Sequence, residues 1–506
     1  MEPEGTDGDL ESVRFIAEKT NCSIVTSPSK DGDGKRILEH AAAKWDRVAL
    51  IRQLLAAWGA VIGSISFGMT TGFSATLSHN LNRGDEAIEI DQNAESWIAS
   101  SVVLWMLMGV ICGSVCMRLY GRRIAQLCLY VNWICGWLIV SYSRNVWSLL
   151  AGCVLIGLSA GSHSVVSAVY VGEISEPGFR GLISVQISLG VAVGILISHA
   201  QGVLLDWRTA LRSSAVLPAI ALALVSTFAC ESPTWLLLKG RVQTAKNVFL
   251  RLRNDALNCE NELNSLIDAA AAYSNRQSQS QSSASSWRRQ MSSKAFRKSF
   301  LVLNVLFVVQ QGSGLNVIVF YAVTMLKTLS ADSQSSSSAA AATADLPSSM
   351  IIVDTVRFFA TLAACVLIKV TGRRKLYFCS ACGAVLSLCA VIVCTLYQLS
   401  HLTLVLLMCA YIAFLYVGVS PIPWIMVGEL YPANLKEFGI CISSFCCFLT
   451  MLTVVKSALF FIVHLGTAIT FAIYATVMLV GVVFLYFHLP ETNNITLQQI
   501  EKNLNS

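Results

Sequence analysis

The sequence predicts an all-α membrane protein with twelve transmembrane helices arranged as two pseudo-symmetric six-helix bundles. Three observations predict it: the composition, the number of long apolar runs, and an internal repeat. Of the 506 residues, 55% are hydrophobic and only 13% are charged, which is typical of a polytopic membrane protein and excludes an ordinary soluble domain. A spanning helix needs about 20 mainly apolar residues. By that rule the expected spans are 54–77, 97–117, 124–142, 147–172, 182–204, 209–229, 299–326, 349–370, 376–397, 401–428, 438–463 and 466–488.

Short motifs recur in corresponding loops of the two halves. Gly121-Arg122-Arg123 returns as Gly372-Arg373-Arg374, Glu173 after the fourth run matches Glu429 after the tenth, and Glu231 after the sixth run matches Glu491 after the twelfth. Each match lies about 250 to 260 residues from its partner, and such a nearly constant offset indicates a duplicated unit.

The segments outside the runs complete the organisation. We expect a cytosolic N-terminal tail at 1–50 with no signal peptide, a first six-helix bundle at 51–230, a linker with short helices at 231–298, a second bundle at 299–489, and a cytosolic tail at 490–506. Basic residues gather after the second and eighth runs and in the linker, whereas the first opposite loop is acidic, so the positive-inside rule places both termini and the linker in the cytosol.

The charge and cysteine content exclude several classes of function. The net charge of +6 does not indicate nucleic-acid binding, because the basic residues lie next to the spans. The 17 cysteines lack metal-ligand spacing. Most of them fall inside apolar runs, where we interpret them as small buried residues. We find no catalytic triad, metal cluster or phosphate loop, and therefore expect no enzyme and no cofactor.

One polar stretch stands out within the seventh run, residues 310–321 with the sequence QQGSGLNVIVFY. A buried amide without a partner costs about 4–8 kcal/mol on the most apolar transfer scale. Membrane helices keep such groups only where they face protein or a water-filled cavity. The stretch therefore predicts one wall of a mid-membrane site for a neutral, hydroxyl-rich solute; a polar packing seam between helices is the alternative.

The motifs taken together resemble the sugar porter family of the major facilitator superfamily, and within it the insect facilitated trehalose transporter group. The resemblance covers about residues 50–500 and rests on these matches: the QQGSGLN stretch, Pro421-Ile422-Pro423-Trp424, both GRR loops, Val169 to Glu173 with Arg180-Gly181, Glu231-Ser232-Pro233, Gly428-Glu429 with Pro432, and Pro490-Glu491-Thr492. It implies an alternating-access carrier with its solute site between repeats.

The resemblance also implies roles for individual residues. Gln310, Gln311 and Asn316 would bind sugar hydroxyls, Trp424 would cover the sugar's C–H face, and Tyr321 would belong to the outer gate. Pro421 and Pro423 would form a hinge, because prolines remove helical hydrogen bonds. Ser188 occupies the fifth-helix position of a sugar-binding glutamine. An inner latch would consist of Arg122, Arg123, Glu173, Arg180, Arg373, Arg374 and Glu429.

Several positions depart from the family pattern. Arg118 and Lys369 replace the acid three residues before each GRR, Cys153 and Thr234 replace latch arginines, and Cys446-Cys447 replaces an Asn-Trp pair. These losses weaken the expected latch. They leave open a non-transporting sugar sensor as a second class of function.

Arg357 is the sharpest departure, since the family has a sugar-binding asparagine there. A charge at this depth is a functional hypothesis by default. Asp354 lies one turn earlier, so the two can pair and leave a site for neutral sugar, which we favour. Alternatively, Arg357 faces the solute and selects an anionic sugar.

The first run bears on whether transport is coupled to protons. Proton-coupled relatives carry an aspartate where this chain has Thr70, so we expect facilitated diffusion; a symporter that uses Asp354 remains the alternative. We expect the carrier in the plasma membrane, with sugar and bilayer as its partners, and a monomer suffices for this mechanism.

Overall fold

The computed structural model describes residues 32–81, 92–253, 263–264, 266–268, 271, 291–320, 346–397, 401–431 and 435–491. Every regular element within these ranges is a helix. Twelve helical segments of this described part are long and apolar enough to cross a membrane, which confirms the predicted number. They match the expected runs to within a few residues at most ends.

The first half contributes six spans. They are formed by α2 (Gly32–Leu81), α3 (Gln92–Tyr120), α4 (Arg122–Ser141), α5 (Val146–Ile174), α6 (Pro177–Leu204) and the pair α7 (Trp207–Ser214) and α8 (Val216–Phe228). Helix α2 starts at Gly32, inside the range expected as a tail, and its membrane-compatible part begins at Val48.

The linker contains α9 (Pro233–Leu238) and α10 (Val242–Arg253), and the second half contributes the other six spans. These are formed by α13 (Lys294–Gly312) with α14 (Leu315–Phe320), α17 (Leu346–Thr371), α18 (Arg373–Leu396), α19 (His401–Phe414) with the π-helical turn η1 (Leu415–Val419) and α20 (Pro421–Leu430), α21 (Lys436–Leu465), and α22 (Thr467–His488).

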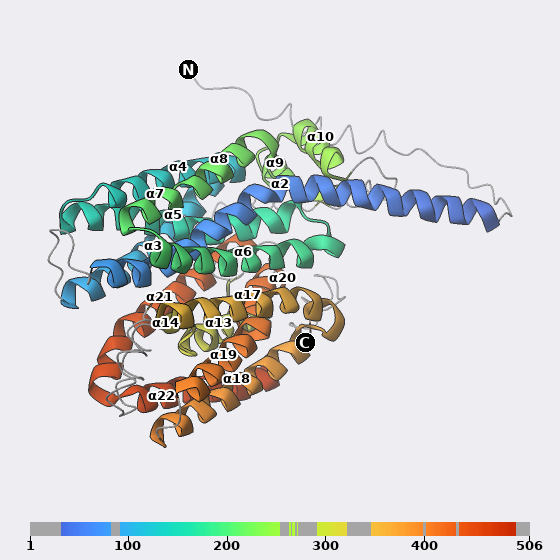
Figure 1. Ribbon diagram of the computed structural model, residues 1–506. Helices are drawn as coiled ribbons and strands as arrows, with labels where there is room; N and C mark the ends of the chain where they lie inside the picture. The colour runs from blue at the N-terminus through green and yellow to red at the C-terminus, as the bar shows by residue number, and fades with distance from the viewer. Residues whose placement is uncertain are drawn as a thin grey trace.

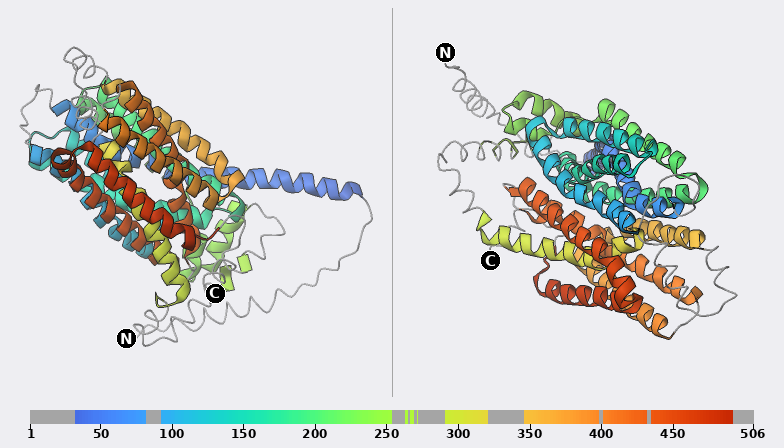
Figure 2. Two further views of the ribbon diagram at one scale, coloured as in Figure 1. Left: turned by 90° about the horizontal axis from the view of Figure 1, so that it is seen from below. Right: turned by 90° about the vertical axis from the view of Figure 1, so that its left-hand side faces the viewer.

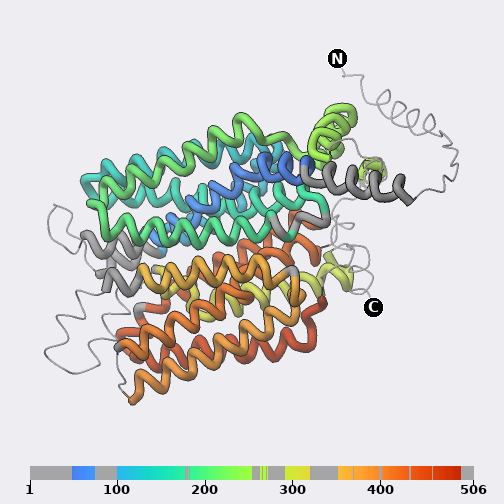
Figure 3. Tube along the Cα trace, turned by 45° about the vertical axis from the view of Figure 1, so that its right-hand side comes forward, coloured from blue at the N-terminus to red at the C-terminus, as the bar shows by residue number. Residues whose placement is uncertain are grey.

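The two halves lie side by side as separate layers of roughly parallel helices (Figures 1 and 2). They meet where α2, α3, α5 and α6 face α14, α17, α20 and α21. Helices α9 and α10 lie at one end of the bundle, which we call the linker end, and we call the opposite end the far end (Figure 3). Arg253 of α10 donates to the carbonyl oxygen of Ile174 at 2.9 Å, which attaches the linker to the end of α5.

Two spans of the second half are interrupted where the sequence predicts it. Gly314 adopts φ of +76°, a left-handed conformation that favours glycine, and it ends α13 and starts α14. In the tenth span, Pro421 opens α20 directly after the π-helical turn η1. A π-helical turn within an α-helix frequently marks a functional site. Pro421 has no backbone N–H group, so it cannot donate a helical hydrogen bond at this point.

The two GRR loops have the same construction, which explains why these motifs repeat. Glu231 accepts hydrogen bonds from the backbone N–H groups of Arg122 (2.7 Å) and Arg123 (3.2 Å) at the start of α4. Glu491 accepts from Arg373 (3.2 Å) and Arg374 (3.1 Å) at the start of α18. A carboxylate at a helix N-terminus satisfies the free N–H groups there. Burial raises the pKa of the Glu231 carboxyl, although these N–H donors act against that rise.

Glycines allow helices of the first half to touch through their backbones. A Cβ atom at Gly161 of α5 would collide with the backbone of Met106 in α3. At Gly68 of α2, it would collide with the backbone of α6 at Val191. Such close approach is the usual reason for small residues at membrane helix interfaces.

We predict that Gly161→Ala lowers the stability of the purified protein by about 1–3 kcal/mol, because the added methyl meets backbone atoms that cannot rotate away. Gly428→Ala is the matched control, since nothing lies within 4 Å of its added Cβ. Thermal unfolding in detergent measures both. An unchanged melting temperature for Gly161→Ala would contradict the close packing of α3 and α5.

Candidate functional site

A cavity lies between the two halves. Helices α2, α5 and α6 supply one wall, and α13, α14, η1, α20 and α21 supply the other. Its polar and aromatic lining residues include Ser64, Phe67, Thr71, His163, Ser164, Ser167, Ser184, Ser188, Gln310, Gln311, Asn316, Tyr416, Ser420, Trp424, Glu429 and Phe448. Five residues expected to contact the solute therefore face one space: Ser188, Gln310, Gln311, Asn316 and Trp424.

The three amides of the seventh span are held by specific partners. Gln310 donates through Nε2 to the carbonyl oxygen of Ser420 at 2.7 Å. Gln311 donates to Cys447 Sγ at 3.1 Å and accepts from Asn316. The Gln310 Oε1 atom is buried and has no hydrogen-bond partner among the described residues. Because a buried acceptor normally finds a donor, this oxygen is ready to receive a hydroxyl of a solute.

The indole of Trp424 forms part of the same wall beside the interrupted tenth span. It packs edge-on against Phe307 of α13, with the ring centroids 5.0 Å apart. Pro421 and Pro423 of the same helix are buried. The Gln310–Ser420 bond joins the amide wall to the residue just before Pro421. A change of angle at the prolines would therefore move the indole and an amide partner together.

The wall from the first half is rich in hydroxyl groups. Of its serines, the sequence predicted only Ser188 as a site residue. Ser64 donates to the Ala60 carbonyl at 2.8 Å and lies 3.1 Å from His163 Nε2. Ser167 donates to the His163 carbonyl at 2.6 Å. Hydroxyls that donate to their own helix keep lone pairs free to accept from a solute. No sequence motif marked these serines, since a lone serine in an apolar run is common.

The electrostatics of the cavity suit an uncharged solute. Among its lining residues that the structure describes there is no Lys or Arg. Glu429, the one carboxylate among these described lining residues, is bound by Arg373 at the linker end. A neutral polyol needs paired donors and acceptors and an apolar face, and the amides and aromatic rings supply both.

Arg357 does not line this cavity, in contrast to our expectation that it lies at the solute site. It is buried, pairs with Asp354 one turn earlier, and stacks over the ring of Tyr416 at 5.1 Å. Asp354 also pairs with His199 of the other half. A buried guanidinium needs a counter-charge, and Asp354 provides it within α17 itself. This arrangement corresponds to the first of the two interpretations of Arg357.

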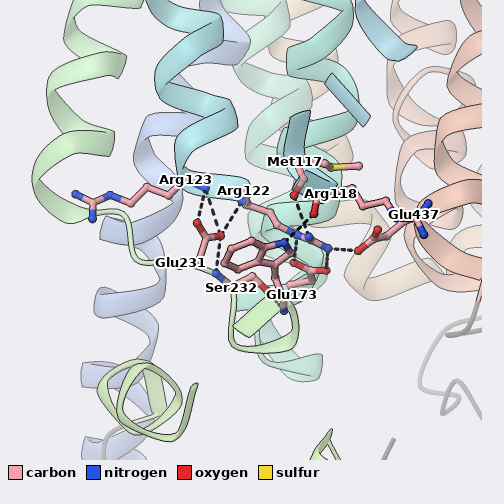
Figure 4. A network of polar contacts seen from close by, with 9 residues as sticks. Met117, Arg118, Arg122, Arg123, Glu173, Glu231, Ser232 and Glu437 are labelled. Atoms are coloured by element: carbon pink, nitrogen blue, oxygen red, sulfur yellow. Dashed lines mark hydrogen bonds and ion pairs between the residues drawn. The ribbon is translucent and has the colours of Figure 1, made fainter. Parts of the chain in front are cut away.

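Figure 4 shows the charged cluster at the linker end of the first half. The buried guanidinium of Arg122 binds both oxygens of Glu173, at 2.9 and 2.8 Å, and donates to the Met117 carbonyl at 3.2 Å. It also pairs with Glu437 at the start of α21, in the second half. Sequence reasoning missed Glu437, because no motif marks it and its partner is far away along the chain.

The second half repeats part of this cluster. Arg373 pairs with Glu429 at the end of α20, as Arg122 pairs with Glu173 at the end of α5. The second arginine of each loop reaches a carbonyl of the last span of its half: Arg123 binds Ser226 and Arg374 binds Tyr486, both at 2.7 Å. The expected latch residues thus gather at one end of the bundle. Tyr321 and the side chain of Arg180 lie outside the described residues.

No group of three or more His, Cys, Asp or Glu residues that could hold a metal occurs in the described part of the chain. The cysteines there are all free thiols.

Three comparisons identify similar proteins. The family model described as "Sugar (and other) transporter" matches residues 48–504. The facilitated trehalose transporter Tret1 of Bombyx mori is 26% identical over 516 residues, covering 100% of this chain and 97% of that protein. The Tret1 protein of Apis mellifera ligustica is 27% identical, covering 96% and 94%. A solved structure of the proton:xylose symporter XylE bound to 6-bromo-6-deoxy-D-glucose has a TM-score of 0.73 at 18% identity, covering 89% of this chain and 99% of that one.

Proposed function

Because the chain belongs to the Sugar (and other) transporter family, we propose that it carries a neutral sugar, a hexose or a trehalose-like disaccharide, across a membrane by facilitated diffusion. The observation that carries this proposal is the cavity between the halves, with amides on one wall, serine hydroxyls on the other and an indole beside them. Alternating access would open it to each side of the membrane in turn.

The choice of solute follows from the chemistry of the walls. Amides offer both donors and acceptors to hydroxyl groups, and Trp424 and Phe448 offer apolar faces for the C–H surface of a sugar ring. The pairing of Arg357 with Asp354 argues against an anionic sugar, because the charge of this arginine is already neutralised. The trehalose transporters among the relatives support a disaccharide as a candidate.

The polar groups of the first span support transport that is not coupled to protons. Thr70 donates to the Ser66 carbonyl at 2.9 Å and accepts from Trp133 Nε1 at 3.1 Å. The resemblance implies an aspartate at this position in proton-coupled members of the family, and a threonine there cannot exchange a proton near neutral pH. We therefore infer downhill transport.

The orientation and site roles belong to the same proposal. We place the linker end in the cytosol of a plasma-membrane protein, because its loops hold most of the basic residues. Residues 51–230 and 299–489 would be the two moving bundles. Gln310, Gln311, Asn316, Trp424 and Ser188 would contact the sugar, and the arginines and glutamates of the linker end would close that end.

A solute panel in proteoliposomes tests the proposal. Loaded with unlabelled sugar, vesicles should accumulate labelled trehalose or glucose by counterflow, without an imposed pH gradient. Glucuronate should not exchange. Preference for glucuronate would contradict the neutral-sugar interpretation, uptake that follows a pH gradient would contradict facilitated diffusion, and sugar binding without any counterflow would indicate a sensor.

A further inference from the structure

A second set of ionisable side chains joins the two halves inside the membrane-spanning region. His199 belongs to α6 in the first half, and Asp354 and Arg357 belong to α17 in the second. All three are buried, with exposed fractions of 3%, 1% and 1%. Ionisable residues inside a membrane are expensive and normally functional, so this cluster needs an explanation.

The carboxylate of Asp354 is the centre of the cluster. Its Oδ2 accepts from His199 Nδ1, and its Oδ1 accepts from Arg357 Nη1. The charge of Asp354 is thus balanced within α17, whereas the bond to His199 crosses between the halves. Separating α6 from α17 would remove one hydrogen bond from a buried carboxylate and leave the imidazole Nδ1 without an acceptor.

The cluster continues to the cavity wall. The Arg357 guanidinium stacks over the ring of Tyr416 at 5.1 Å, and Tyr416 lines the cavity from the π-helical turn η1. On the other side, the space beside His199 Nε2 is bordered by Gly72 of α2, whose added Cβ would stand 3.4 Å from that nitrogen. Within the part of the chain that the structure describes, the ionisable groups that contact this cluster are Asp354, Arg357 and Tyr416.

This cluster lies closer to the far end of the bundle, whereas the charged cluster in Figure 4 lies at the linker end. His199 lies near the C-terminal end of α6, and Asp354 lies near the N-terminal end of α17, so their bond is closer to the far end. Another cross-half ion pair, Arg122–Glu437, lies at the linker end. The cavity reaches the linker end, where Gly172 and Glu429 line it.

We propose that the His199–Asp354 bond is a far-end clasp: it forms when that end closes over the cavity and breaks when that end opens. Arg357 and Tyr416 act as positioning residues that transmit closure to the cavity wall. This inference rests on the proposed carrier function, because it names the gate of that same cavity.

Hydrogen exchange measured by mass spectrometry on the full-length protein tests the clasp. His199→Ala should speed amide exchange at the far ends of α6 and α17 by about tenfold and slow it at the linker end, since populations move toward the far-end-open state. His199→Asn keeps an N–H donor near the position of Nδ1 and should restore much of the wild-type pattern. His464→Ala, at the exposed far end of α21, is the control and should change neither end.

A second variant keeps the test decisive if His199→Ala does not fold. Asp354→Leu with Arg357→Met removes both charges together, so no lone charge remains in the membrane. It should also open the far end, and it should raise the sugar KM because Tyr416 loses its support. Unchanged far-end exchange in both variants overturns the clasp, as does a failure of His199→Asn to differ from His199→Ala.

The outcome separates the clasp from the carrier function. Counterflow by the wild type without any exchange shift in the variants would overturn the clasp alone. An exchange shift in a protein that moves no sugar would support the clasp and contradict the carrier.

Discussion

Gln311→Leu should reduce the kcat/KM of sugar transport about 30- to 150-fold, with most of the loss in KM. The change removes the hydrogen bonds to a sugar hydroxyl and leaves Asn316 and Cys447 without their partner, a cost of about 2–3 kcal/mol. Initial rates of labelled-sugar uptake in proteoliposomes, over a range of concentrations, measure it.

The control for this change is Asn304→Leu, on the same helix. Asn304 donates to the Phe300 carbonyl at 2.7 Å and does not line the cavity, so the same replacement of an amide by an aliphatic group should leave transport nearly unaltered. Equal losses in the two variants would show that Gln311 acts through the fold of α13 and not through the solute.

Arg122→Gln should open the linker end and lower sugar turnover at least about tenfold. A buried cation that bridges Glu173 and Glu437 is lost, and two carboxylates remain without it, which costs about 3–5 kcal/mol in the closed state. Amide exchange at the linker ends of α5 and α21 should rise, and exchange at the far end should fall, which is the opposite of the shift expected for His199→Ala.

A second substitution, Glu437→Gln, distinguishes a loss of closure at the linker end from a loss of folding. It removes the cross-half pair and leaves the Arg122–Glu173 pair within the first half intact. We expect a smaller shift in the same direction, because Glu437 is 35% exposed. Arg118→Gln, at the exposed end of α3, serves as the control. If Glu437→Gln leaves linker-end exchange unchanged, the two halves are not held together there by this ion pair.

Much of the fold followed from local properties of the sequence. Twelve apolar runs predicted twelve spans, because spanning length is set by the bilayer. The amides of residues 310–316 predicted a polar wall, and they do line the cavity, because groups so costly in hydrocarbon rarely occur there without a use. The GRR loops revealed the repeat. In each loop the backbone N–H of an arginine binds a carboxylate that is distant along the chain, so the motif occurs once in each half.

The partners across the interface could not be predicted in this way. The sequence offered Asp354 as a partner for Arg357, one helical turn away, but gave no sign of His199, the partner of Asp354 in the other half. Glu437 likewise looked like an ordinary charge at a helix start. Both contacts depend on how the two halves are placed against each other, and neither periodicity nor motif spacing carries that information.

The most direct test of the central claim is a cryo-electron microscopy structure of the full-length protein with a saturating concentration of its transported sugar. We predict density for one sugar between the amides of Gln310, Gln311 and Asn316 and the indole of Trp424, with the serine wall of α5 and α6 opposite. Sugar bound elsewhere, or amides and indole packed against neighbouring side chains with no room for a solute, would contradict it.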